Sequence, residues 1–313
     1  MTLVSIITPS YNQAAYLEVA IRSVLGQDHP QIEYLIIDGG STDGSVEIIK
    51  KYADRLAWWV SEPDSGQADA INKGFVRTHG EIVAWLNSDD YYLPDAISDA
   101  VTAFSLYPDT MMIHGDALAV DEQGRTINRL SGRQLSLEDL LCFQIINQPA
   151  VFVRRSAWEK AGKLDASLHF LLDHQFWIRL ASMGSIRHIP QYWAAARFHA
   201  AAKNRARALD FGSEATRILV WAGQDPVLAP ILANVSHRAR ASAQRFNARY
   251  YLDGGRAWQA LKSWTHAFWL HPPTALARMN LLISSILMLT GMSVLRERIL
   301  INRRARLSAG DKT

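Results

Sequence analysis

The sequence predicts an α/β fold: a mostly parallel, doubly wound sheet with helices on both faces, followed by a helical C-terminal region. Over the first 120 residues, short apolar runs of strand length alternate with segments whose apolar residues recur at helical spacing. Parallel strands need crossover connections between them, so this alternation indicates a parallel sheet. From about residue 200 onward alanine, arginine and leucine dominate and no strand pattern persists. We therefore expect an α/β domain at residues 1–205 and a helical region at 206–313.

Composition excludes several classes of protein. A net charge of +3 is too small to indicate a nucleic-acid partner, although the pI is near 9.0. The single cysteine, Cys142, rules out an intrachain disulfide and a cysteine-rich zinc site. The chain enters an apolar strand at once, without the basic and apolar segments of a signal peptide. We therefore expect a cytoplasmic protein that binds no nucleic acid.

The first part of the chain supplies the strands and crossover helices in order. Apolar runs predict strands at residues 3–8, 34–38, 57–60 and 82–86. Helical spacing predicts helices at residues 14–25, 45–52 and 67–76. Pro94 is expected in the first turn of the next helix, because proline suits that position.

Later segments add a second group of strands and then helices alone. We expect strands at residues 111–114 and 117–120, joined by a turn at Gly115 and Asp116, and further strands at 150–155 and 193–197. We expect helices at residues 136–143, from about Asp173, and at 213–222, 230–252 and 255–270. Residues 248–273 resemble one tetratricopeptide-like hairpin, which cannot stand alone and should dock on the α/β domain or on a partner.

Polar, glycine-containing loops follow the first four predicted strands. They cover residues 9–12, 38–45, 62–67 and 87–90. The carboxyl ends of parallel strands meet at one edge of a sheet, where open α/β folds bind their ligands. Turn formation alone would explain any one of these loops, but less well the carboxylates that end two strands, Asp38 and Asp89. Neither a G-x-G-x-x-G nor a P-loop motif occurs, which argues against a dinucleotide oxidoreductase and a P-loop ATPase.

Asp89 and Asp90 form an acidic pair directly after the apolar run at 82–86. Two neighbouring carboxylates repel each other unless a cation or strong donors neutralise them. Oxygen ligands suit Mg²⁺ or Mn²⁺, which also share substrate phosphates. We hypothesise a metal-bridged diphosphate site here. The alternative is that Ser88, Asp89 or Asp90 caps the helix expected near Pro94.

Four stretches together resemble family 2 glycosyltransferases: residues 8–12, 37–45, 69–74 and 86–90. The resemblance covers roughly residues 1–200, with the motifs in the family's order. It implies a GT-A fold, a nucleotide-diphosphate sugar as donor, inversion at the anomeric carbon, and Mn²⁺ or Mg²⁺ as cofactor.

The resemblance implies that the first-strand loop and the acid ending the second strand hold the nucleoside. These positions are Pro9, Tyr11 and Asp38. Tyr11 offers an aromatic face for a base, and the alternative is packing within the loop. The chain departs from the family at Gly39, where many members have a second acid, and at Ile71, where many have arginine.

Other positions are expected near the diphosphate and the sugar. Asp64 and Lys73 are the charged candidates, although Lys73 could equally form a surface ion pair with Asp69 four residues earlier. Gln148 corresponds to a position that the family places near the sugar; a polar loop residue is the alternative.

The metal is expected at Asp90, with Asp89 facing the ribose or the water ligands of the metal. The segment 197–199 resembles an Arg-x-His motif whose histidine, here His199, approaches the metal or the diphosphate. A structural role for His199 is the alternative. Lys203 and Arg205 follow and could close over the phosphates.

Asp173 matches the aspartate that serves as catalytic base in the family, at the start of an aromatic-rich helix. An acid usually precedes it, but here that position is Leu172, and an apolar neighbour raises the pKa of a carboxylate toward that of a useful base. The alternative is that Asp173 only caps the helix.

The sequence therefore predicts an inverting, metal-dependent glycosyltransferase that moves a sugar from a nucleotide-diphosphate sugar to an acceptor hydroxyl. The family suggests a glycan or glycolipid acceptor in bacterial surface polysaccharide or glycolipid synthesis. One alternative is a sugar-nucleotide nucleotidyltransferase, but residues 9–13 lack the basic triphosphate loop that it needs. Another is a non-catalytic protein that binds nucleotide sugars or acts as a scaffold.

The most apolar stretch lies at residues 281–292 and is shorter than a helix that spans a bilayer. Arginines follow it at Arg296, Arg298, Arg303, Arg304 and Arg306. An apolar helix followed by arginines suits an anionic membrane surface, and we favour such a peripheral position at the inner face of the membrane. A buried helix with a solvated basic tail is the alternative.

Overall fold

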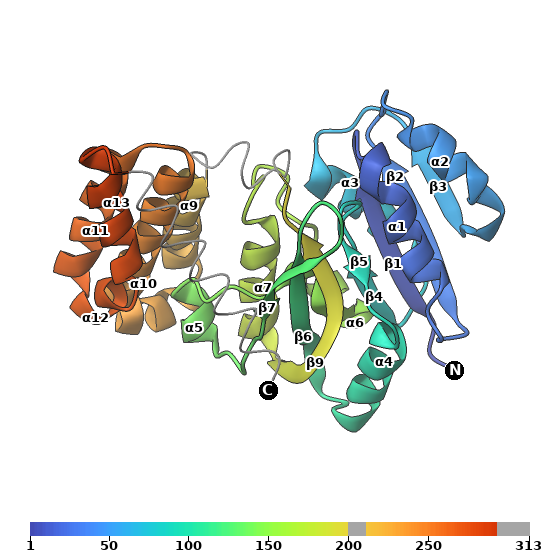
Figure 1. Cartoon of the computed structure of the whole chain (residues 1–313). Coiled ribbons are helices and arrows are strands. Elements are labelled where there is room, and N and C mark those ends of the chain that lie inside the picture. Colours follow the sequence, from blue (N-terminus) through green and yellow to red (C-terminus); the bar gives the residue numbers. More distant parts are fainter. Residues whose placement is uncertain (200–210, 293–313) are drawn as a thin grey trace, which may run out of the picture. The chain divides into compact units, whose positions relative to one another are not determined.

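The computed structural model describes residues 1–199 and 211–292, which form two compact units (Figure 1). The first unit comprises Met1–Leu135 and Ile146–Phe198. The second comprises Ser136–Ile145 and the chain from His199 onward. Lys203, Arg205 and the arginines from Arg296 to Arg306 lie outside the described residues.

The first unit is built on a nine-stranded sheet with the order β3-β2-β1-β4-β8-β6-β9-β5, and β7 pairs with β6. Its strands are β1 (Val4–Ser10), β2 (Ile32–Asp38), β3 (Trp58–Ser61), β4 (Ile82–Trp85), β5 (Tyr91–Tyr92), β6 (Thr110–Val120), β7 (Thr126–Leu130), β8 (Val151–Arg154) and β9 (Ser185–Arg197). β1 is parallel to both β2 and β4, β2 is parallel to β3, and β6 is parallel to β9. The β4–β8, β8–β6, β6–β7 and β5–β9 pairs are antiparallel.

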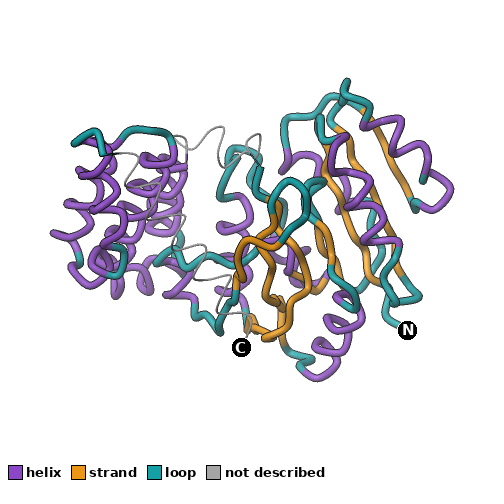
Figure 2. The backbone as a smooth tube through the Cα atoms, in the orientation of Figure 1, coloured by secondary structure: helices purple, strands orange, loops and turns teal. Residues whose placement is uncertain are grey.

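Helices cover both faces of this sheet, as the sequence predicts (Figure 2). They are α1 (Ala14–Leu25), α2 (Ser45–Lys51), α3 (Gln67–Val76), α4 (Ala96–Leu106), α6 (Arg155–Ala161) and α7 (Leu172–Met183), with 3₁₀ turns η1 (Ala53–Arg55) and η2 (Gln148–Ala150). Alternation along the strands explains the two layers. Ile6 and Ile36 pack under α1, whereas Ile7 and Ile37 face α3, where a Cβ at Gly74 would come within 2.7 Å of both.

The predicted strands and helices of the first 86 residues are all present, with shifts of one to three residues at some ends. Two local predictions are wrong. Residues 111–120 form one continuous strand, β6, because β9 pairs along its whole length and Trp193 covers Gly115. Pro94 lies outside a helix, since α4 begins at Ala96 after Asp95, which adopts a left-handed conformation with φ of 63°. The short strand β5 occupies the segment just before Pro94.

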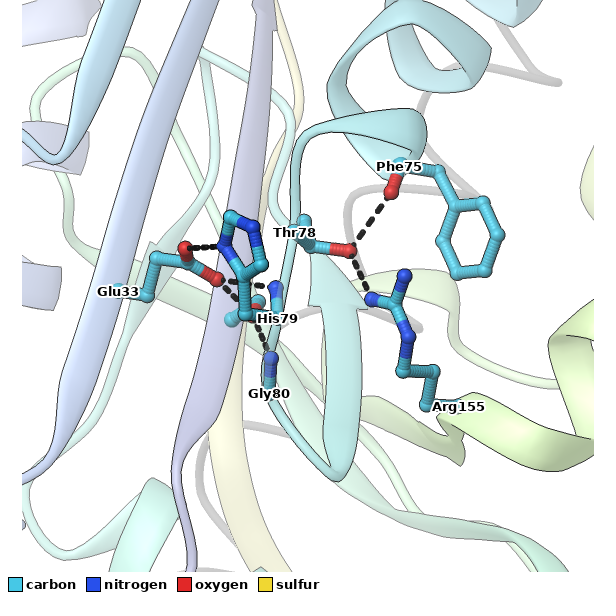
Figure 3. A network of polar contacts seen from close by, with 7 residues as sticks. Glu33, Phe75, Thr78, His79, Gly80 and Arg155 are labelled. Carbon is cyan, nitrogen blue, oxygen red and sulfur yellow. Dashed lines mark hydrogen bonds and ion pairs between the residues drawn. The ribbon is translucent and has the colours of Figure 1, made fainter.

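A polar network joins the loop between α3 and β4 to the amino ends of the neighbouring strands (Figure 3). Glu33 accepts hydrogen bonds from the backbone N–H of His79 at 2.7 Å and from the hydroxyl of Ser5. The Gly80 N–H donates to Ser5 Oγ at 2.8 Å, and a Cβ at Gly80 would lie 2.6 Å from that oxygen. Arg155 donates to the Thr78 hydroxyl at 2.7 Å. These bonds fix the start of β4 against β1 and β2, and hence the position of the residues that follow β4.

The second unit is helical in its described part. It contains α5 (Leu137–Leu141), α9 (Phe211–Gln224), α10 (Leu228–Asp253), α11 (Ala257–Leu270), α12 (Pro272–Leu276) and α13 (Met279–Leu289). Its core includes Ala248, Leu252, Trp264 and Leu281, and the Trp264 indole N–H donates to the carbonyl of Ala275 at 3.1 Å. Gly255 turns the chain between α10 and α11 with φ of +75°, which explains a glycine there. None of the helices described in the chain combines the length and apolarity needed to cross a bilayer.

Candidate active site

The loops predicted to share one edge of the sheet do meet there, at the carboxyl ends of β1, β2, β3 and β4. The Gly39 N–H donates to the Ser10 carbonyl at 2.8 Å, which joins the ends of β1 and β2. The Glu62 N–H donates to the Asp38 carbonyl at 3.0 Å and brings in the loop after β3. β1 has β2 on one side and β4 on the other, so this edge contains the topological switch point of the sheet. Open α/β sheets bind ligands at this point.

Asp38 is fully buried and organises the loop that follows β2. Its two oxygens accept hydrogen bonds from the N–H groups of Gly40 and Ser41 and from the hydroxyls of Ser41 and Ser61, at 2.5–3.1 Å. The carboxylate therefore holds the backbone of the cradle in shape. Direct contact with a nucleoside stays a prediction.

Tyr11 projects from the loop after β1, and 62% of its surface is exposed. The neighbouring Asn12 has φ of 51°, and its side chain accepts the Thr42 N–H at 2.9 Å while its own N–H donates to Ser41 Oγ. These bonds fix the loop and leave the aromatic ring available, which does not favour the packing alternative. Pro9, by contrast, is a buried residue of β1.

Asp64 lies beside Gly39, at the place that the sequence marks as lacking the family's second acid. A Cβ at Gly39 would come within 2.8 Å of Asp64 Oδ2, so a larger residue at 39 would displace this carboxylate. Asp64 Oδ1 accepts the Gly66 N–H at 2.8 Å. The carboxylate therefore occupies the space beside the end of β2.

Lys73 forms ion pairs with two acidic side chains. Its ammonium lies 3.1 Å from Glu62 and 3.6 Å from Asp69. The hydrogen bond that the Lys73 ammonium donates to Glu62 raises the pKa of Lys73 and so favours its charged form. The ion pair with Asp69 is therefore present, and a role with the diphosphate requires Lys73 to exchange these partners.

Asp89 and Asp90 do not cap a helix. The N-cap of α4 is Asp95, and its side chain makes no capping bond. Only 7% of Asp90 is exposed, and its oxygens accept the Arg197 N–H at 2.9 Å and the Asn87 amide at 3.3 Å. Burial, with the neighbouring carboxylate of Asp89, raises the pKa of Asp90 well above the ordinary aspartate value. A divalent cation would offset both effects, so this pair fits one.

Arg197 holds the acidic pair in place from β9. Its guanidinium donates to the carbonyl of Asp89 at 3.0 Å and to those of Asp121 and Glu122 at 3.1 and 2.9 Å. It also lies over the rings of Tyr16 and Tyr91. The sequence places Arg197 in the Arg-x-His segment, but its role as the anchor of the acidic loop becomes visible only in the structure.

A chain of amides connects the acidic loop to two other elements. Gln67 Nε2 donates to Asn87 Oδ1 at 2.7 Å, and Asn87 Nδ2 donates to Gln148 Oε1 at 3.0 Å. Gln148 Nε2 in turn donates to the carbonyl of Trp85 at 2.8 Å. Both ends of the Gln148 amide are thus used within the protein. Sequence reasoning missed Gln67 and Asn87, although both lie in the polar loops that it singles out.

Asp173 lies in the first turn of α7, and Leu171 is the N-cap. The alternative in which Asp173 is only the N-cap of this helix is therefore wrong. Trp177, one turn further along, stacks on Trp85 with 5.1 Å between ring centroids. Because Trp85 ends β4 four residues before Asp89, this contact ties α7 to the strand that carries the acidic pair.

His199 is buried and belongs to the second unit, so its predicted approach to the metal stays a prediction. Within residues 1–199 and 211–292, no three His, Cys, Asp or Glu side chains gather as a group able to hold a metal. Two carboxylates are a usual number of protein ligands for Mg²⁺ or Mn²⁺, because water molecules and substrate phosphates complete the coordination.

The strand order, the switch point beside β4 and the acidic pair after it define the class of the protein: an α/β fold of the GT-A type. Solved structures agree. S. aureus TarS 1-349 in complex with UDP-GlcNAc aligns with 89% of this chain and 92% of that chain, with a TM-score of 0.61 and 15% identity. The mannosyltransferase PcManGT from Pyrobaculum calidifontis, in complex with GDP-Man and Mn²⁺, aligns with 98% and 85%, with a TM-score of 0.61 and 19% identity.

The model of the Glycosyl transferase family 2 matches residues 5–150. An uncharacterized glycosyltransferase of Mycobacterium tuberculosis is 31% identical over 188 residues, which is 57% of this chain and 68% of that protein. The putative teichuronic acid biosynthesis glycosyltransferase TuaG of Bacillus subtilis is 44% identical over 98 residues, 30% of this chain and 39% of TuaG. The chain belongs to glycosyltransferase family 2. It spans 60% of the length of a further relative, an uncharacterized glycosyltransferase of Rickettsia typhi, at 27% identity and 59% of this chain.

Proposed function

We propose that the protein transfers a sugar from a nucleotide-diphosphate sugar to an acceptor hydroxyl, with inversion at the anomeric carbon. One observation carries the proposal: the buried Asp90 and its neighbour Asp89 are held together at the switch point of a GT-A-like sheet. Two adjacent carboxylates in this position lower the stability of the fold unless a cation neutralises their charge. Related structures were determined with UDP-GlcNAc and with GDP-Man, which supports a nucleotide sugar as donor.

In this proposal the cradle after β1 and β2 receives the nucleoside. The exposed ring of Tyr11 stacks on the base, with Pro9 and the Asp38-ordered backbone beneath it. Asp64 accepts a hydrogen bond from the base or the ribose, in the space that Gly39 leaves free. Lys73 turns from Glu62 toward the diphosphate when the donor arrives, because a phosphate offers a denser negative charge.

Asp90 and Asp89 would hold Mn²⁺ or Mg²⁺. When bound, the cation supplies Lewis-acid stabilisation of the departing diphosphate. A relative in complex with GDP-Man and Mn²⁺ supports a divalent metal. Gln148 and Asn87 keep the Asp90 carboxylate in place beside the sugar.

Asp173 is the proposed catalytic base. It would take the proton of the acceptor hydroxyl as that oxygen attacks the face opposite the leaving diphosphate. Its place at the start of α7, which packs on the end of β4 through Trp177, supports this role.

The proposed acceptor is a glycan or glycolipid of the bacterial surface, with the reaction at the cytoplasmic face of the membrane. The similarity to TuaG, named for teichuronic acid biosynthesis, supports a surface polymer. The family places such synthesis at the inner face, where a peripheral position of the protein brings donor and acceptor together.

A thermal-shift screen of nucleotide sugars with and without Mn²⁺ tests this proposal. We expect one nucleotide-diphosphate sugar to raise the melting temperature in the presence of Mn²⁺. Asp90→Asn should lose at least tenfold in Mn²⁺-dependent nucleotide affinity, because it removes one charge from the metal pair; Asp109→Asn, an exposed acid of the same unit, is the matched control. Unchanged Mn²⁺-dependent affinity in Asp90→Asn would refute the site. Stabilisation only by a nucleoside triphosphate with a sugar phosphate would favour the nucleotidyltransferase instead.

A further inference from the structure

The helices α11–α13 expose an unusual amount of apolar surface. On α13, Met279, Ile283, Ile286 and Leu289 are all exposed, and Ile283 and Ile286 show 49% and 45% of their surface. Their spacing of four, three and three residues places them along one side of the helix, which we call the apolar face. Trp269, at the end of α11, is 83% exposed. In the described part of the chain this face has no protein covering.

The Asp, Glu, Lys and Arg positions in the sequence around the apolar face carry positive charge alone. From Gly254 to Met292 the sequence contains no Asp or Glu, whereas Arg256, Lys262 and Arg278 are positive. A helix face that meets only water normally carries mixed charges beside its apolar residues. A surface that is both apolar and bordered only by cations complements one that is apolar and anionic.

A cluster of three arginines lies within the same unit. Arg245 of α10 is half-buried, and its electrostatic neighbours include Arg249 and Arg278. Burial, followed by the positive charges of Arg278 and Arg249, lowers the pKa of Arg245. Within residues 211–292 the structure gives Arg245 no carboxylate partner, and Arg249 has only a long contact of 3.8 Å with Asp253. With Asp253 as the one carboxylate that the described contacts give these three arginines, the cluster keeps a net positive charge.

Phosphate is the anion that fits three arginines best, because guanidinium groups match its oxygens in pairs. Arg278 is also the N-cap of α13 and directly precedes Met279, the first residue of the apolar face. The anion site and the apolar face are thus joined at one end of α13. A phospholipid provides both parts, a phosphate headgroup and an apolar chain.

We propose that α13 lies on an anionic phospholipid surface, with the apolar face among the acyl chains and Arg245, Arg249 and Arg278 on headgroup phosphates. This inference deepens the proposed location of the reaction at the inner face of the membrane. It does not depend on sugar transfer itself, because none of these residues belongs to the candidate active site. A short amphipathic helix of this kind lies in the interface plane and does not cross it.

Flotation of the full chain with vesicles tests the proposal. We expect binding to vesicles of equal phosphatidylglycerol and phosphatidylcholine, and weak binding to pure phosphatidylcholine. Ile283→Glu with Ile286→Glu should lower binding to the anionic vesicles at least tenfold, because both side chains are exposed and the change brings charge into the acyl region. Leu106→Glu, an equally drastic change at an exposed apolar residue of the first unit, is the control and should bind like the wild type.

The arginine cluster is tested separately with Arg245→Gln and Arg278→Gln together. This variant should lose several-fold in binding to anionic vesicles and become less sensitive to salt, with binding to neutral vesicles unchanged. Ile283→Gln with Ile286→Gln serves as a milder replacement should the glutamate pair prevent folding. Circular dichroism and the melting temperature confirm that each variant is folded.

Wild-type binding by the Ile283 and Ile286 variants would overturn the proposal. The proposal would also be overturned if light scattering showed a wild-type dimer that these variants convert to a monomer, while neither the wild type nor the variants bound vesicles. That result would assign the apolar face to a second copy of the chain. The thermal shift with nucleotide and Mn²⁺ should stay unchanged in all of these variants. Loss of vesicle binding with intact nucleotide binding therefore separates this proposal from that of the active site.

Discussion

At the scale of single residues, His114 is a buried histidine that the fold keeps uncharged. Its ring lies 5.1 Å from that of His188, and its Nε2 has no hydrogen-bond partner within the described chain. Burial, followed by the electrostatic effect of the neighbouring His188, lowers the pKa of His114 to about 4. The neighbouring His188 donates from Nε2 to Asp116 Oδ1 at 2.7 Å, and Asp116 lies within β6 rather than in a turn.

This histidine gives the first unit a predictable acid sensitivity. Unfolded, His114 binds its proton near pH 6.5, whereas in the folded chain it does so only near pH 4, so the unfolded state takes up protons first as the pH falls. Stability should therefore fall between pH 6.5 and 4, and this residue accounts for about 2 kcal/mol at pH 5 relative to pH 7. His114→Gln should remove that part of the slope.

Urea unfolding at pH 7 and pH 5 measures this difference. His29→Gln changes a half-buried histidine of the same unit and is the control. A wild-type pH dependence in His114→Gln would show that other groups produce the acid sensitivity.

At the scale of elements, the amide chain from Gln67 through Asn87 to Gln148 connects α3, the end of β4 and η2. Asn87 is its centre, because its one amide group contacts Gln67, Gln148 and Asp90. Removing it leaves polar groups of the other elements without their partner, at about 1–3 kcal/mol for a buried group. Asn87 thus acts as a positioning residue for Asp90.

Asn87→Ala should lower the apparent Mn²⁺ affinity in nucleotide binding five- to tenfold, since the Asp90 carboxylate loses a donor that fixes its orientation. Saturating Mn²⁺ should restore most of the transfer rate, and Asn87→Asp should not. The measurement is a Mn²⁺ titration of nucleotide affinity and turnover. A uniform loss of stability with unchanged Mn²⁺ dependence would reduce Asn87 to a structural role.

The elements also show what a sequence can predict. The sequence predicts the helices at 14–25 and 67–76 to the residue, because their apolar spacing and their flanking glycines and polar residues are local signals. The strand β5 escaped prediction because it exists only through pairing with Ala194 and Ala195, far along the chain. The same holds for β6, whose continuity comes from β9. Likewise, Asp38, Asp89 and Asp90 could be found at strand ends, whereas the Asn87–Gln148 contact arises only when the chain is folded.

At the scale of the whole molecule, the proposed site has two halves built by different parts of the first unit. The donor half comes from the loops after β1, β2 and β4, and the acceptor half from the start of α7. The Trp85–Trp177 stack is the physical link between them, and Trp158 and Phe176 pack around it. Because the two halves come from separate elements, a substitution in one half that keeps this stack should leave the other half able to bind its ligand.

Asp173→Asn tests this separation. It keeps the size of the side chain and removes the base, so transfer should fall by a factor of about 10²–10⁴. The dissociation constant of the donor with Mn²⁺ should remain within about twofold of the wild-type value, because the donor half is intact. Donor binding by calorimetry and transfer to acceptor are measured on the same preparations, with Asp109→Asn as control. Full transfer activity in Asp173→Asn would exclude it as the base, and an equal loss of donor affinity would place Asp173 in the donor half instead.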